Sequence, residues 1–126
     1  MLTLIDSSSW THVIRRKGTP AIRDRVAHLL RERDAAWCDI VRLELWRGVG
    51  GEEDRAVLLK LEANVRLLPI TDKIWQSACD LASHARRKGL AIPANDFLVY
   101  ACATAHHAKL EANDKHYAAI ARIVDA

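Results

Sequence analysis

The chain has 126 residues and a mass of 14.1 kDa, and half of its residues are apolar, so it has the size of one domain with enough apolar side chains for a buried core. Its 19 basic and 16 acidic residues give a net charge of +3, which permits an anionic partner but falls well short of the charge of a polybasic protein. These figures exclude a disordered chain, and no apolar run approaches the roughly 18–20 residues that a membrane span needs.

The first half of the chain predicts two strands, each followed by helices. Apolar runs of strand length occur at 2–5 and, more weakly, at 35–38. Ser7-Ser8-Ser9 offer N-caps to a helix whose last turn holds Arg15-Arg16-Lys17, and Thr19-Pro20 begin the next helix. The expected order is a strand at 2–5, helices at 7–17 and 19–30, a strand at 35–38 and a helix at 39–48 that Asp39 can cap.

The second half continues this alternation. The strand-like run at 65–68 is limited by Pro69, and Thr71 can cap the long helix that follows. The expected order is a helix at 52–61, a strand at 65–68, helices at 71–88 and 95–107, a strand at 109–112, a short helical stretch and a strand-like pair at 123–124. Strands that alternate with helices predict an α/β fold with a mainly parallel sheet and helices on both of its faces.

The N-terminus and the cysteines predict a cytoplasmic protein. We expect no signal peptide, because MLTLIDSSSW reaches an acid at its sixth residue and has no basic region. The three cysteines are far apart in apolar surroundings and form no CxxC motif, so neither a disulfide framework nor a zinc ribbon is expected.

Four acids are placed where a functional site is expected. Asp6 directly follows the first strand and Asp114 follows the strand at 109–112, while Glu44 and Asp96 lie on helices that begin at the same sheet edge. Ligands of such folds bind beyond the carboxyl ends of the strands, so the four side chains are expected to converge. Converging carboxylates repel one another, and a hard cation relieves the repulsion. An acidic cluster without cysteines or histidines at zinc spacing favours Mg²⁺ or Mn²⁺.

Each of these acids also has an ordinary explanation. Asp6 is a turn residue after a strand, although its apolar neighbours favour a semi-buried position. Asp96 suits the dipole of a helix N-terminus, Glu44 suits an exposed helix position, and Asn113-Asp114 suits a turn. Spacing alone therefore leaves both explanations open.

Four blocks of sequence, in order along nearly the whole chain, resemble the PIN-domain family, specifically the VapC-type ribonuclease toxins of type II toxin–antitoxin pairs. LIDSSSW at the N-terminus resembles the strand–Asp–Ser/Thr opening of the family, and ELWRG at 44–48 resembles its E-L-x-x-G motif. IPANDFLVYACA at 92–103 resembles the stretch with the third acid and its helix of small residues, and NDKHY at 113–117 resembles the D-x-H/D-aromatic ending. The resemblance depends on the ordered set, since each block alone is weak.

The resemblance implies a single PIN domain over residues 1–126, with a three-layer α/β/α sandwich and a mainly parallel sheet. It implies an endoribonuclease toxin that inhibits translation or growth by hydrolysing RNA phosphodiester bonds with in-line attack by water. Its cofactor would be Mg²⁺ or Mn²⁺, and its partners would be a VapB-like antitoxin and a second copy of the chain, with no membrane. The residues that the resemblance assigns to both catalysis and metal binding are Asp6, Glu44, Asp96 and Asp114.

One departure from the family pattern and three accessory candidates surround these acids. The family often has Thr or Ser two residues before the fourth acid, where this chain has Ala112, so a hydroxyl is missing unless Ser7 or Asn113 substitutes. Ser7 either orients Asp6 or a water, or caps a helix. His116 either contacts substrate phosphate or the surroundings of the metal, or is an exposed histidine after a turn.

Three other functions remain to be weighed. A PIN nuclease of RNA processing would share the fold and the acids. A non-catalytic PIN-like or receiver-like binding module would not need all four acids, and a receiver would need an acid where Leu68-Pro69 end the third strand. A phosphatase of the haloacid-dehalogenase type would need D-x-D where this chain has Asp6-Ser7-Ser8.

Overall fold

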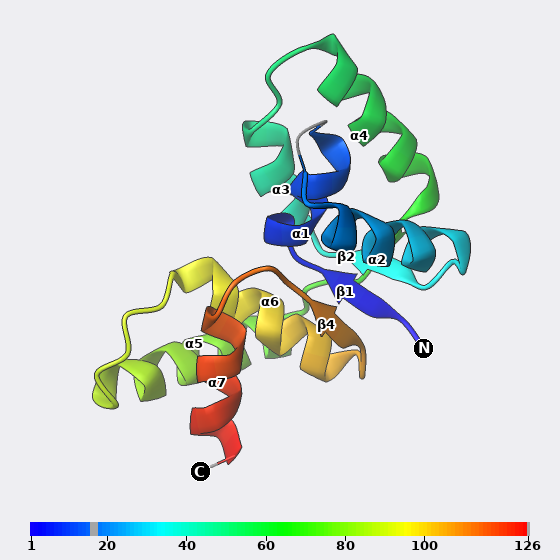
Figure 1. The fold of residues 1–126 in the computed structure, drawn as a ribbon. Helices are drawn as coiled ribbons and strands as arrows, with labels where there is room; N and C mark the ends of the chain where they lie inside the picture. The colour runs from blue at the N-terminus through cyan, green and yellow to red at the C-terminus, as the bar shows by residue number, and fades with distance from the viewer. Residues whose placement is uncertain (16–17, 126) are drawn as a thin grey trace.

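The computed structural model describes residues 1–15 and 18–125, so Arg16 and Lys17 of the predicted basic run lie outside the described residues. Within the described part the chain forms four strands and seven helices (Figure 1). Their bounds are β1 (Thr3–Ile5), α1 (Ser7–Ile14), α2 (Pro20–Arg31), β2 (Ala35–Trp37), α3 (Asp39–Arg47), α4 (Glu52–Asn64), β3 (Arg66–Leu67), α5 (Asp72–Arg87), α6 (Ala94–Ala105), β4 (Lys109–Glu111) and α7 (His116–Asp125).

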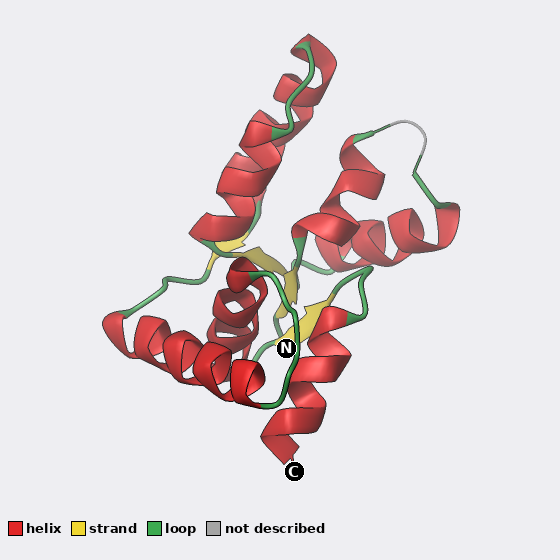
Figure 2. Ribbon diagram, turned by 90° about the vertical axis from the view of Figure 1, so that its left-hand side faces the viewer, coloured by secondary structure: helices red, strands yellow, loops and turns green. Residues whose placement is uncertain are grey.

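The four strands form one parallel sheet in the order β3-β2-β1-β4. In its register Leu4 pairs with Ala36 on one side and with Leu110 on the other. Helices α1 to α4 lie on one side of the strands and α5 to α7 on the other, so the sheet is the middle layer of a sandwich (Figures 1 and 2). The predicted α/β/α fold with a parallel sheet is confirmed. Because the strands are parallel, the residues that follow β1 and β4 emerge at the same edge.

The core forms where the sheet meets its two helical layers. Leu4 and Ile5 of the central strand β1 are fully buried, as expected of a parallel strand that is covered on both faces. The indole rings of Trp10 and Trp37 are also buried and pack with their centroids 5.6 Å apart. In the ranges 1–15 and 18–125, no helix is both long enough and apolar enough to cross a bilayer.

The predicted C-terminal strand is wrong. Residues 123–124 lie in α7, which continues to Asp125. Tyr117 and Ile120 are buried and Ile123 packs partly against the core, so apolar residues recur every third position along one face of a helix. This period outweighs the strand propensity of an isolated Ile-Val pair.

Two of the predicted helix starts are shifted by one residue, and a third is confirmed. The N-cap of α1 is Asp6 rather than one of the three serines, which lie in the first turn of the helix. Cys38 precedes α3, so Asp39 is its first residue. Thr71 caps α5 as predicted, because its hydroxyl accepts a hydrogen bond from the backbone N–H of Ile74 at 3.3 Å.

Candidate active site

Asp6 lies at the centre of the carboxyl edge of the sheet, at the junction of β1 and α1. It is only 3% exposed. Its backbone N–H donates to the carbonyl of Glu111 at 2.9 Å, which joins it to the end of β4. Its carboxylate Oδ2 accepts a hydrogen bond from the hydroxyl of Ser8 at 2.9 Å. The first predicted acid is therefore a buried carboxylate whose position is fixed by both neighbouring segments.

Glu44 projects from α3 toward the same edge. It is half-buried, and its carboxyl group accepts a hydrogen bond from the side chain of Ser7. Burial raises the pKa of Glu44, and the nearby charges of Asp6 and Asp96 raise it further, while Arg47 and Ser7 lower it by smaller amounts. Glu44 thus lies close enough to Asp6 and Asp96 for their charges to raise its pKa.

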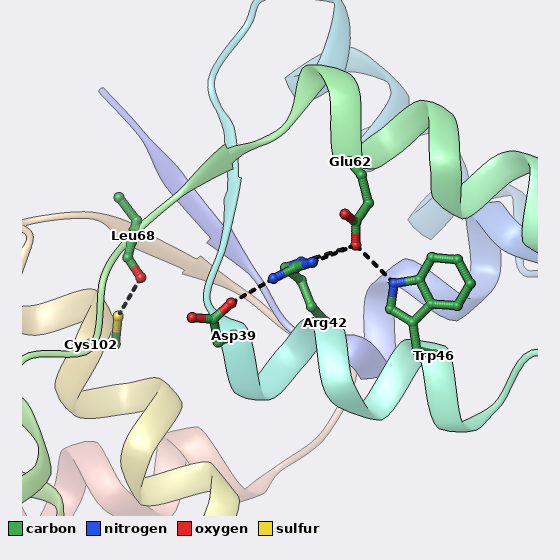
Figure 3. Close-up of polar contacts among 6 residues, drawn as sticks. All are labelled: Asp39, Arg42, Trp46, Glu62, Leu68 and Cys102. Atoms are coloured by element: carbon green, nitrogen blue, oxygen red, sulfur yellow. Dashed lines mark hydrogen bonds and ion pairs between the residues drawn. The ribbon is translucent and has the colours of Figure 1, made fainter.

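Contacts on the opposite side of α3 hold this helix in place (Figure 3). The guanidinium of Arg42 binds Asp39 at 2.7 Å and Glu62 of α4 at 2.8 Å. The indole N–H of Trp46 donates to the same Glu62 oxygen at 2.8 Å. Arg42 and Trp46 are four residues apart and share one helix face, so Glu44 between them points the other way. The hydrogen bonds between α3 and α4 therefore fix the orientation of α3, and they leave the carboxyl group of Glu44 free to face the sheet edge.

Asp96, Asp114 and His116 form the second half of the cluster. The Nδ1 atom of His116 lies 2.8 Å from Asp96 Oδ2 and 3.8 Å from Asp114 Oδ1. The backbone N–H of His116 donates to Asp114 Oδ1 at 2.9 Å. Burial raises the pKa of Asp96, and the charges of Asp114 and Asp6 add to this rise, which His116 partly offsets. Ligand atoms of the three residues all lie within 4.8 Å of one another.

Tyr117 is a member of this cluster that sequence reasoning did not single out. It is buried, and its hydroxyl lies 3.4 Å from Asp96 Oδ1 and also hydrogen-bonds Asp6. Burial raises the pKa of Tyr117, and the charges of Asp6 and Asp96 raise it further, so the phenol keeps its proton and can donate to these carboxylates. Tyr117 is the aromatic residue that ends the NDKHY block, and this position in the motif was the sequence feature that could have indicated its role.

The accessory candidates have distinct partners. Ser7 contacts Glu44 and does not cap α1. Asn113 donates its backbone N–H to the hydroxyl of Ser8 at 2.9 Å. A hydroxyl therefore does reach the loop that follows Ala112, and it comes from Ser8, which the sequence had suggested only as a cap.

Asp6 and Glu44 lie within electrostatic reach of Asp96, so four carboxylates from four segments gather at this edge with one imidazole and one phenol. Among the described residues, those with ligand atoms within 4.8 Å of one another are Asp96, Asp114 and His116. Burial raises the pKa values of Glu44 and Asp96, and repulsion from neighbouring acids raises them further. A site rich in oxygen donors with such uncompensated charge fits a hard divalent cation. Beside Glu44, a pocket of about 230 Å³ lined by Ser7, Arg47 and Gly48 opens toward solvent. The arrangement can hold a cation and leaves room for a ligand next to it.

Replacing Glu44 with glutamine is expected to stabilise the metal-free protein at neutral pH. Because the pKa of Glu44 is raised in the folded protein, the fold favours the protonated carboxyl group. The folded state therefore loses stability relative to the unfolded state as the pH rises from the ordinary glutamate pKa to the raised one. Glutamine stays neutral at every pH and keeps the shape of the side chain. In EDTA we expect the Tm of Glu44→Gln to exceed that of the wild type by a few degrees at about pH 7.5. The difference should vanish near pH 4, below the ordinary glutamate value of 4.5.

Differential scanning calorimetry at both pH values measures this effect. Glu52→Gln, at an exposed position in the first turn of α4, is the matched control and should not raise the Tm. A lower Tm for Glu44→Gln at neutral pH would contradict the charge repulsion inferred for the cluster.

Comparison with known proteins agrees with the geometry. Residues 3–123 match the PIN domain family. Ribonuclease VapC11 from Mycobacterium tuberculosis is 30% identical over 128 aligned positions, which cover 98% of this chain and 95% of that protein.

Solved structures with a similar fold include two DNA-bound VapBC structures. VapBC2 from Rickettsia felis, bound to a DNA fragment from its promoter, is 22% identical, with a TM-score of 0.76 over 91% of this chain and 89% of that chain. DNA-bound VapBC from Salmonella typhimurium is 18% identical, with a TM-score of 0.77 over 94% of this chain and 92% of that chain. At these identities the likeness concerns the fold.

Proposed function

The chain belongs to the PIN-domain family, and from that premise we propose that it is an endoribonuclease toxin of the VapC type with a VapB-type antitoxin as its partner. The relative that shares 30% identity over nearly the whole of both chains is a VapC ribonuclease. The family match over 3–123 also supports one PIN domain for residues 1–126. The observation that carries the proposal is the meeting of Asp6, Glu44 and Asp96 with the loop of Asp114 at one sheet edge.

We propose that Asp6, Glu44, Asp96 and Asp114 hold Mg²⁺ or Mn²⁺ and are the catalytic residues. A divalent cation supplies positive charge against the phosphodiester and acidifies a water molecule. The four carboxylates provide oxygen ligands, and their mutual repulsion in the free protein favours cation binding. Tyr117 orients Asp6 and Asp96 through its hydroxyl. His116, which bonds Asp96 in the free protein, is placed to contact the cation or a substrate phosphate.

The balance of charged residues in the sequence supports RNA as the substrate. When the four proposed site acids are set aside, twelve acidic residues remain against nineteen basic ones, an excess of seven positive charges. An excess of positive charge in the rest of the chain suits a polyanionic substrate, and its contribution to binding would weaken with salt. A homodimer is part of the same proposal, as the resemblance to the family implies.

The chemistry of the RNA ends tests the proposed activity. Hydrolysis by an activated water leaves a 5′ phosphate and a 3′ hydroxyl, whereas attack by the RNA 2′ hydroxyl leaves a 2′,3′-cyclic phosphate. We expect antitoxin-free protein with Mn²⁺ to cut total RNA at discrete positions, with 5′ phosphates at the new ends. Ligation-based sequencing that requires a 5′ phosphate maps these positions, and phosphatase-treated RNA is the control.

Expression in cells distinguishes a toxin from a processing nuclease or a binding module. Induction of the wild-type protein should arrest growth, and co-expression of a small antitoxin encoded beside its gene should relieve the arrest. Cleavage without growth arrest would indicate a PIN nuclease of RNA processing. An absence of both would indicate a non-catalytic binding module.

A further inference from the structure

The hydroxyl of Ser8 joins two of the segments that carry the proposed metal-binding acids. It donates to Asp6 Oδ2 at 2.9 Å and accepts from the backbone N–H of Asn113 at 2.9 Å. Asp6 lies between β1 and α1, and Asn113 directly precedes Asp114 in the loop between β4 and α7. Ser8 and Asn113 are 105 positions apart, so this hydroxyl links parts of the site that are remote along the chain.

The directions of the two hydrogen bonds follow from the donors available. A backbone N–H can only donate, so the Ser8 oxygen must accept from Asn113. The single proton of the hydroxyl is then directed at Asp6, whose Oδ2 accepts it. A hydrogen bond to a carboxylate is stronger than one between neutral groups, so the Ser8 hydroxyl fixes the orientation of the Asp6 carboxylate.

We propose that Ser8 is a positioning residue of the active site, which holds the carboxylate of Asp6 and the loop of Asp114 at the separation that a divalent cation requires. The inference rests on the proposed function, since it concerns how that function's metal site is assembled. Ser8 acts through Asp6 and Asn113.

The serines on either side of Ser8 have different partners. Successive residues of a helix point about 100° apart, so three adjacent serines face three directions. Ser7 contacts Glu44, while Ser9 is fully buried and donates to Glu111 Oε2 at 3.0 Å. Ser9 is therefore a matched control, because it makes a hydrogen bond of the same kind from the same helix to a carboxylate that is not one of the four proposed metal-binding acids.

A second contact anchors the Asn113 loop without Ser8. The side-chain amide of Asn113 lies 3.2 Å from Nε2 of His12, and Nδ1 of His12 accepts from the backbone N–H of Thr19 at 2.8 Å. Ser8 and His12 are four residues apart on α1 and so share one of its faces. Loss of the Ser8 hydroxyl should therefore disturb the spacing of the carboxylates while the loop stays attached to α1.

The experiment compares Ser8→Ala, Ser8→Thr and Ser9→Ala with the wild type. Mn²⁺ affinity is measured by electron paramagnetic resonance of the free ion, and kcat and KM are measured on a short RNA that contains one mapped cleavage site. We expect Ser8→Ala to weaken Mn²⁺ binding and to lower kcat about 10- to 100-fold, with KM changed by less than about threefold. Ser8→Thr keeps the hydroxyl and should restore both quantities to within a few fold of wild type. Ser9→Ala should keep the Mn²⁺ affinity within about twofold even if its Tm falls.

Wild-type Mn²⁺ affinity and kcat in Ser8→Ala would overturn the inference and leave the proposed function intact. Equal losses of Mn²⁺ affinity in Ser8→Ala and Ser9→Ala, in proportion to their loss of Tm, would also overturn it, because both serines would then act only on stability. If the wild-type protein neither binds Mn²⁺ nor cuts RNA, the proposed function fails, and the inference about Ser8 fails with it.

Discussion

Replacing Asp96 with asparagine is expected to lower the rate of RNA cleavage at least about 1,000-fold and to abolish growth inhibition. Asp96 lies where the acids meet, because it contacts His116 and Tyr117 and lies within the electrostatic reach of Asp6 and Asp114. The substitution removes a charged oxygen from the proposed metal site. Losing about 4 kcal/mol of the stabilisation that a metal supplies in the transition state corresponds to a rate loss of this size.

The fold should survive this substitution. Asparagine has nearly the shape of aspartate, and its carbonyl oxygen can still accept from Tyr117. Because the pKa of Asp96 is raised in the fold, a neutral side chain should not lower the Tm of the metal-free protein at neutral pH. Asp72→Asn is the matched control, since Asp72 also lies in the first turn of a helix but is exposed and on α5. Full cleavage activity in Asp96→Asn would remove Asp96 from the proposed site.

The fold could be predicted largely because its signals are local. The two central strands β1 and β2 are short, fully buried runs, and a cap or a proline marks the helices that begin at Pro20 and Asp72. The edge strands β3 and β4 contain charged residues, so they depended more on the alternation of strands and helices. The exception is α7, where an Ile-Val pair was mistaken for a strand because the helical period from Tyr117 spans only a few residues. The parallel order of the sheet followed from the alternation of strands and helices.

The site was predictable only where topology determines position. Asp6 and Asp114 follow strands, so a parallel sheet places both at one edge whatever their partners are. Ser8 and Tyr117 were missed as site residues because their partners depend on long-range packing. The Ser8 hydroxyl meets a backbone N–H 105 positions away, and the Tyr117 hydroxyl contacts Asp96, 21 positions away. No spacing rule along the chain reports such contacts.

The acidic cluster lowers the stability of the metal-free protein and, for the same reason, favours the binding of a cation. Burial and mutual repulsion raise the pKa values of Glu44 and Asp96, so ionising them at neutral pH disfavours the fold. A bound cation would make ionisation of these carboxylates favourable to folding. The cation binds the ionised carboxylates, which are brought together only in the folded state, so it stabilises that state. The same geometry that makes the free site unfavourable thus makes cation binding favourable.

Removal of divalent cations is accordingly expected to affect both activity and stability. EDTA should reduce RNA cleavage to the background rate, and excess Mg²⁺ or Mn²⁺ should restore it. The cation should also raise the Tm, since a ligand present at about 100 times its Kd stabilises the fold by about 2.7 kcal/mol. Calorimetry in EDTA and in Mn²⁺ measures this gain in the absence of RNA, so it is independent of the cleavage assay.

The pH dependence of cation binding provides the strictest form of this test. Protons compete with the cation for Glu44 and Asp96, and their raised pKa values move this competition above the pH range of ordinary carboxylates. The apparent Kd for Mn²⁺ should therefore increase as the pH falls from about 8 to about 5.5, and Asp96→Asn should bind Mn²⁺ weakly throughout that range. Cleavage that persists in EDTA, or a Tm that Mn²⁺ does not raise, would contradict a metal-dependent site, because four converging carboxylates would then have no counter-charge to account for their arrangement.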